Sequence, residues 1–186
     1  MKNVFLIFLS LCAITFTSAQ TEIGDAVLPN SETFGEHQLV LNGAGVREKF
    51  WIDMYVGALY LPKKSTDAKA ILENGQPVAV KLYIVSRLIS SERMSDAVDD
   101  GFRKSTKGNT APFKKKIDKF KTFFSEEINK DDVFDITYQP ALGVVVYKNG
   151  KKLGEIQGED FKTAVFGIWL SEHPANEDLK KAMLGM

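Results

Sequence analysis

Apolar residues gather in stretches whose composition is typical of β-strands. Residues 46–61 (VREKFWIDMYVGALYL) are dense in aromatic and β-branched side chains and are followed by Pro62. This pattern predicts one long strand, either straight or with a bend, that is polar at its start and buried towards its end. Residues 78–85 (VAVKLYIV) and 131–139 predict two further strands.

Turn residues separate these stretches. Residues 144–147 and 151–156 flank Asn149-Gly150, which predicts a β-hairpin closed by a type I′ turn. Gly43-Ala44-Gly45 predicts another turn, placed before the long strand. Residues 20–37 are polar with scattered glycine and proline, and they predict a loose lead-in or an edge strand.

Helical spacing of apolar residues follows the strands. Thr66 is placed to cap a short helix, and Ser90 is placed to cap a longer one that ends before Gly108. The later stripes contain Phe113, Ile117, Phe120, Phe124 and Ile128, then Phe161, Ala164, Val165, Ile168 and Trp169, and finally Leu179 and Met183. Strands and helices do not alternate strictly, so the pattern predicts an α+β fold with a large, mainly antiparallel sheet and helices packed on one face.

The first nineteen residues have the pattern of a secretory signal peptide. Lys2 precedes an apolar run at 4–16, and Thr17-Ser18-Ala19 supplies a small-residue cleavage site. The run is shorter than the roughly 20 residues that span a bilayer. We therefore expect a signal peptide at 1–19 and one domain at 20–186, exported to the periplasm or secreted. An uncleaved anchor, a core helix or a lipidated Cys12 are the alternatives.

Composition narrows the function. The chain has 186 residues, of which 44% are hydrophobic, enough for one globular domain with a full core. Lys+Arg and Asp+Glu both number 24, which argues against a general nucleic-acid binder. Cys12 is the only cysteine, and His37 and His173 are the only histidines. No metal site and no cofactor are expected, haem included, since no ligand set has metal-binding spacing.

Two charged features allow opposite interpretations. Residues 103–121 contain eight Lys and Arg residues but only one acidic residue, Asp118. The basic residues form either a collar that attracts an anionic ligand or a lipid surface, or the solvated faces of two amphipathic helices. The solvated surface is the favoured interpretation. Arg47 follows the GAG segment at an apolar strand, where a guanidinium needs a partner. It either clamps a carboxylate, phenolate or enolate in an apolar cleft, or pairs with Glu48 or another acid.

Two blocks of the sequence resemble the chalcone isomerase family, and in particular its exported bacterial chalcone isomerase-like branch. They are residues 43–61 (GAGVREKFWIDMYVGALYL) and 161–180 (FKTAVFGIWLSEHPANEDLK). The resemblance implies an open-faced β-sandwich with a ligand cleft between sheet and helices. The family includes enzymes that cyclise chalcones and relatives that bind fatty acids without catalysis. Arg47 matches the arginine that holds the ligand's negative charge in the enzymes.

Other positions depart from the enzymes of the family. Tyr55 and Ile168 stand where the enzymes have threonines, Arg93 stands near a tyrosine position, and Asp100 stands near an asparagine position. These changes remove donors that orient the substrate and water, so chalcone cyclisation is not expected from the resemblance.

We therefore expect a non-catalytic, exported protein that binds a small amphipathic anion, such as a fatty acid or a polyphenol-like compound. Arg47 would hold the anionic group, aided by Tyr55 and Arg93, and Ile168 would line the cleft. The alternative is an intramolecular lyase or isomerase acting on an enone or chalcone-like substrate, with Arg47 as its catalytic residue. Membrane contact is left open, without a sequence feature to support it.

Overall fold

The computed structural model describes residues 20–186, so the predicted signal peptide at 1–19 lies outside the described residues. Its strands are β1 (Gln20–Ile23), β2 (Ala26–Pro29), β3 (Ser31–Phe34), β4 (His37–Lys49), β5 (Ile52–Leu61), β6 (Val78–Ile84), β7 (Val133–Gln139), β8 (Gly143–Lys148) and β9 (Lys151–Ile156). Its helices are α1 (Ala68–Glu73), α2 (Ser91–Ser105), the 3₁₀ turn η1 (Ala111–Phe113), α3 (Lys114–Thr122), α4 (Glu159–Leu170) and α5 (Glu177–Met183).

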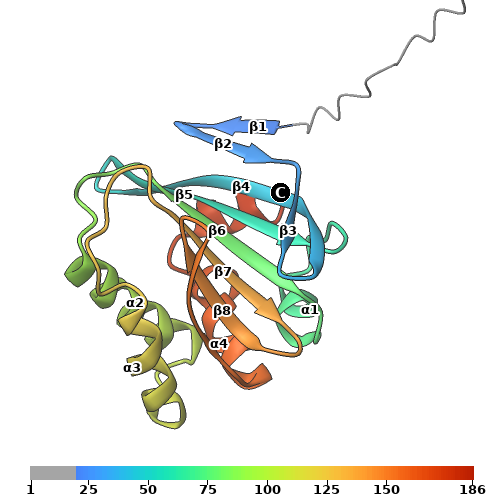
Figure 1. Cartoon of the computed structure of the whole chain (residues 1–186), viewed down its shortest axis with the longest axis vertical. Coiled ribbons are helices and arrows are strands. Elements are labelled where there is room, and N and C mark those ends of the chain that lie inside the picture. Colours follow the sequence, from blue (N-terminus) through green and yellow to red (C-terminus); the bar gives the residue numbers. More distant parts are fainter. Residues whose placement is uncertain (1–19) are drawn as a thin grey trace, which may run out of the picture.

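The strands β3 to β9 form one sheet of seven strands in sequence order, and every neighbouring pair is antiparallel. Helix α1 connects β5 to β6, α2 and α3 connect β6 to β7, and α4 and α5 follow β9. Figure 1 shows α2 and α3 at the opposite end of the molecule from the β1–β2 hairpin. The predicted α+β architecture, with an antiparallel sheet and helices on one side, is confirmed.

Side chains of β5 alternate between two cores, one on each face of the sheet. Tyr55, Leu59 and Leu61 belong to the larger core, which the helices cover. Val56, Ala58 and Tyr60 belong to a smaller core that includes Ala26, Leu28 and Phe34 of the N-terminal strands. This alternation is the period-two pattern of a strand buried on both faces. The helix-covered core is the one that contains the candidate site.

The predictions for residues 20–61 were wrong in three places. Residues 20–37 form three strands rather than a loose lead-in, although one of them, β3, is an edge strand of the sheet. Residues 46–61 belong to two strands joined at Phe50-Trp51. The GAG segment is no turn, because β4 runs straight through it. Its glycines make room for α5: a Cβ on Gly43 would lie 2.2 Å from the Ala182 carbonyl oxygen, and one on Gly45 would lie 2.6 Å from the Ala182 Cβ.

Local signals elsewhere predicted the structure more closely. Asn149 and Gly150 both have positive φ, at 50° and 79°, and they close the β8–β9 hairpin as expected. The Ser90 hydroxyl caps α2 by accepting a hydrogen bond from the Arg93 amide. The cap predicted at Thr66 was one residue early, because the carboxylate of Asp67 accepts from the Ala70 amide at 2.9 Å. An ionised carboxylate makes the stronger cap.

Lys162 of α4 is fully buried, with 0% of its surface exposed. Its ammonium group donates to the carbonyls of Ile71 at 2.8 Å and Leu72 at 3.1 Å, and to that of Asn74. These carbonyls lie at the C-terminal end of α1, where a helix has unpaired acceptors. Burial lowers the pKa of Lys162 to about 8, although Glu159 opposes the shift.

The lowered pKa of Lys162 predicts that stability rises with pH. Between about 8 and its unfolded value of 10.5, the unfolded chain binds more protons than the folded protein does. From about pH 7.5 to about pH 9.5 the wild type should gain about 2 kcal/mol relative to Lys162→Met, which lacks this group. Urea unfolding of both proteins at the two pH values measures the difference. Parallel curves for the two proteins would show that the lysine titrates normally.

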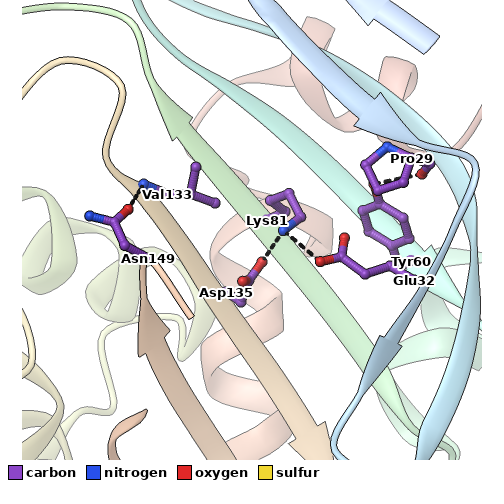
Figure 2. Close-up of polar contacts among 7 residues, drawn as sticks. All are labelled: Pro29, Glu32, Tyr60, Lys81, Val133, Asp135 and Asn149. Carbon is purple, nitrogen blue, oxygen red and sulfur yellow. Dashed lines mark hydrogen bonds and ion pairs between the residues drawn. The ribbon is translucent and has the colours of Figure 1, made fainter. Parts of the chain in front are cut away.

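A buried ionic cluster lies on the face of the sheet that the helices do not cover. The ammonium of Lys81 lies 2.7 Å from a carboxylate oxygen of Asp135 and 3.1 Å from one of Glu32 (Figure 2). Lys81 and Asp135 are cross-strand partners on β6 and β7, whereas Glu32 comes from β3. The contact shows that β3, at one edge of the sheet, curls over this face.

Candidate functional site

A cavity of about 520 Å³ opens between the sheet and the helices α2, α3 and α4. This volume is in the range of small-molecule sites. Its inner wall is formed by buried apolar and aromatic side chains, contributed by three strands, three helices and the loops that follow β6 and α3: Tyr55, Leu82, Ile89, Met94, Val98, Phe120, Phe124, Ile136, Ile168 and Trp169. Lining residues that are exposed instead, Lys49, Phe50, Ile52, Leu88, Arg93 and Asp96, mark the mouth.

The polar part of the cavity is built by the pairing of β4 with β5. Arg47 and Tyr55 are cross-strand partners, and a bulge follows directly between Arg47 and Glu48. The guanidinium carbon of Arg47 lies 5.5 Å from the centre of the Tyr55 ring. This is cation–π distance, so the ring holds the guanidinium against the cavity wall without neutralising its charge.

Arg47 has no anionic partner among the described residues. None of the ion pairs within residues 20–186 includes it, and its buried Nε atom has no hydrogen-bond acceptor there. Glu48, the partner in the alternative interpretation, is exposed and makes no such pair. A buried donor without an acceptor is costly, and an anion in the cavity would satisfy it.

Tyr55 supplies a second donor beside Arg47. Its hydroxyl oxygen accepts a hydrogen bond from the Trp169 indole nitrogen at 3.0 Å, and no described residue accepts its proton. Burial raises the pKa of Tyr55, although Arg47 and the bond from Trp169 oppose the shift. The hydroxyl is therefore neutral at physiological pH and can donate to a bound oxyanion.

The structure brings the other sequence-predicted residues to the same cavity in different roles. Arg93 is exposed at the mouth, where its guanidinium donates to the Leu88 carbonyl at 2.9 Å. Ile168 is buried and packs so closely on α2 that a Cβ on Gly101 would lie 2.9 Å from its Cγ2. Asp100 also lines the cavity, but it forms ion pairs with Lys104 and Arg103. Its pKa is lowered, mainly by the hydrogen bond from Lys104.

Several lining residues were not expected at a site. Trp169 was recognised only as part of a helical apolar stripe, as were Phe120 and Phe124. Their spacing is that of ordinary core residues, and a cavity wall needs the same side chains as a filled core. Trp169 lies within the second family-like block, which was the only sequence signal that could have marked it.

The part of the chain that the structure describes does not bring together the residues of a second candidate site. Within residues 20–186, no three His, Cys, Asp or Glu side chains are grouped to hold a metal ion. No helix of that part is long and apolar enough to cross a membrane. Six of the eight basic residues between 103 and 121 form surface ion pairs, such as Lys114–Asp118, Lys116–Asp160 and Lys121–Asp99. This pairing favours the interpretation of a solvated surface.

Comparison with known proteins shows which fold and which family the chain shares with them. The structure resembles the crystal structure of a fatty-acid-binding protein from Arabidopsis thaliana, with a TM-score of 0.68 and 15% sequence identity. The match covers 86% of this chain and 91% of the plant protein, and at this identity it shows the fold alone. None of the curated proteins matches the sequence. The profile described as chalcone isomerase-like matches residues 20–185. The chain therefore belongs to the chalcone isomerase-like family.

Proposed function

We propose that this protein is a non-catalytic carrier of a fatty acid or a similar amphipathic anion, and that it acts after export from the cytoplasm. The observation that carries the proposal is the Arg47 guanidinium, which has no ion-pair partner within residues 20–186 and lies beside the Tyr55 hydroxyl, whose proton no described residue accepts. Both line a cavity whose inner wall is otherwise apolar. A plant protein of the same fold is named for binding fatty acids, which supports this ligand class.

The head group and the tail of a fatty acid would be recognised by different parts of the cavity. The carboxylate would accept hydrogen bonds from Arg47 and Tyr55, and a bond to a charged donor contributes about 1.5–3 kcal/mol. The tail would lie along the inner wall formed by Met94, Phe120 and Phe124. Each methylene transferred from water contributes about 0.8 kcal/mol, so the tail supplies most of the affinity.

The residues around Arg47 support binding more than catalysis. An isomerase must hold its substrate in a reactive geometry and transfer a proton. Ile168 offers only an alkyl group, and Tyr55 stays protonated because its pKa is raised by burial. Asp100 is engaged by Lys104 and Arg103. The arrangement therefore has an anion clamp without a well-placed general base.

The test compares the affinity of a fatty acid with that of the matching primary alcohol in delipidated protein. Arg47→Met should weaken binding of the acid roughly 10- to 100-fold, because it removes the charged donor. Binding of the alcohol should change less than about threefold, since the apolar wall is intact. Isothermal titration calorimetry measures both, and Arg87→Met is the matched control because Arg87 is exposed and does not line the cavity.

The same variant separates loss of function from loss of fold. Arg47→Met removes a buried unpartnered nitrogen, so the ligand-free variant should be at least as stable as the wild type towards urea. Equal affinity of variant and wild type for the acid would refute the clamp. If the wild type consumed an added chalcone and Arg47→Met did not, the isomerase alternative would replace the carrier.

A further inference from the structure

The hairpin between β4 and β5 ends in two exposed aromatic residues. Phe50 is 79% exposed and Trp51 is 91% exposed, whereas every other Phe, Tyr and Trp side chain within residues 20–186 is buried or half-buried. Ile52 and Leu88, which are 42% and 46% exposed, lie beside them at the cavity mouth. Exposed apolar side chains that gather in one place are typical of an interaction surface.

The backbone at this tip is strained by the residues that occupy it. Phe50 and Trp51 have φ of 54° and 60°, and the pair Lys49–Ile52 closes the hairpin around them. Such two-residue turns favour Asn-Gly, because bulky side chains are disfavoured at positive φ. The same chain uses Asn149-Gly150 for the corresponding turn between β8 and β9. The two aromatic side chains therefore oppose folding of the turn, which points to a role outside the fold.

The position of the tip indicates what it contacts. Phe50 and Leu88 line the mouth of the cavity that would take an amphiphile, so a surface that covered the tip would also cover the entrance. The ammonium of Lys49 lies 5.6 Å from the centre of the Phe50 ring, next to the apolar tip. Glu48 and Asp53 are the next cross-strand partners along the ribbon, and by the alternation of a strand their acidic side chains lie on its other face. An aromatic end with one flanking cation fits a lipid headgroup layer.

We propose that Phe50, Trp51, Ile52 and Leu88 form a membrane-docking tip, which inserts into the interface of a phospholipid bilayer and holds the cavity mouth against it. Trp and Phe anchor proteins at the headgroup level, and Lys49 would reach the phosphates. A fatty acid could then pass between bilayer and cavity without crossing water. This transfer rests on the proposed carrier function, whereas docking itself does not.

Trp51→Gly provides the sharpest test, because Trp51 does not line the cavity and glycine tolerates positive φ. Binding of the full chain to phosphatidylcholine vesicles is measured by sedimentation, with the first 19 residues identical in all proteins. We expect Trp51→Gly to reduce the vesicle partition coefficient at least about tenfold while raising the urea unfolding midpoint. The double variant Phe50→Asn/Trp51→Gly, which copies the β8–β9 turn, should lose the remaining tip-dependent binding.

Val27→Ser is the matched control, because Val27 is also exposed, at 52%, but lies on the β1–β2 hairpin. It should leave vesicle binding unchanged. Vesicles with brominated acyl chains should quench the fluorescence of Trp51, which locates the contact. Equal vesicle binding by Trp51→Gly and wild type would overturn the proposal. So would a wild-type dimer that Trp51→Gly breaks without any vesicle binding, because the tip would then join two copies of the chain.

Fatty-acid titrations without vesicles keep this proposal separate from the carrier function. If Trp51→Gly binds fatty acid within about twofold of the wild type but takes it up more slowly from vesicles, docking serves delivery. If the wild type binds vesicles through the tip and no fatty acid at all, docking stands and the carrier function fails.

Discussion

Lengthening a saturated fatty acid from eight to fourteen carbons is expected to tighten its binding on the order of 10³-fold, because six methylenes at about 0.8 kcal/mol each leave water. The inner wall that would receive them is apolar and aromatic, and the cavity has room for a ligand of this class. A displacement titration across the series of acids measures the slope of binding free energy against chain length.

A variant that narrows the cavity tests where the tail lies. Ala97 on α2 is half-buried and lines the cavity, so Ala97→Phe should leave short acids bound by Arg47 while the gain with length ends at a shorter chain. A wild-type affinity that does not depend on chain length would mean that the tail stays in solvent. That result would contradict a carrier whose affinity comes from the apolar wall.

Replacing Lys81 with methionine is expected to lower the free energy of unfolding by about 3–5 kcal/mol. The ammonium holds the carboxylates of Asp135 and Glu32, and both Lys81 and Asp135 are buried in the sheet. Burial already raises the pKa of Glu32, and the charge of Asp135 adds to the shift, although Lys81 opposes it. Without Lys81, two like charges would remain in a desolvated site. Urea unfolding near neutral pH measures the loss.

The pH dependence of this loss identifies its cause. In Lys81→Met the folded pKa of Glu32 should rise further above its unfolded value, so the variant regains stability as pH falls through that raised value. Glu32→Gln is the control: it keeps a group beside Lys81 and removes one negative charge, so its unfolding free energy should change by less than about 1 kcal/mol. A loss below about 1 kcal/mol in Lys81→Met would show that the cluster is well hydrated.

Features with a local cause could be predicted from the sequence. The Asn149-Gly150 hairpin and the Ser90 cap depend on residues a few positions apart, and both are where the sequence places them. The Phe50-Trp51 turn could not be predicted in this way, because its residues oppose the turn that they form. The GAG segment was misinterpreted because its glycines serve close packing against α5, about 140 positions later.

The candidate site also combines residues that the sequence could predict with residues that only the structure brings together. Arg47 and Tyr55 were found through a family-like block, and their strands are neighbours in sequence and in the sheet. The bond from Trp169 to Tyr55 joins residues 114 positions apart, and the inner wall of the cavity combines side chains of three strands and three helices. Apolar periodicity shows which side chains face inward, but it does not show where they fail to fill the space between layers.

The amino-acid sequence by itself determined the α+β class, most of the helices, the sheet strands after residue 77 and the arginine on which the site depends. Only the tertiary structure decided that no carboxylate within residues 20–186 pairs with Arg47, that Lys162 ends inside the protein against α1, and that a strained aromatic turn stands at the cavity mouth. The physical reason is the distance along the chain over which each interaction acts. Turn and helix preferences act over a few residues, whereas charge pairing, burial and empty space depend on which distant segments the fold brings together.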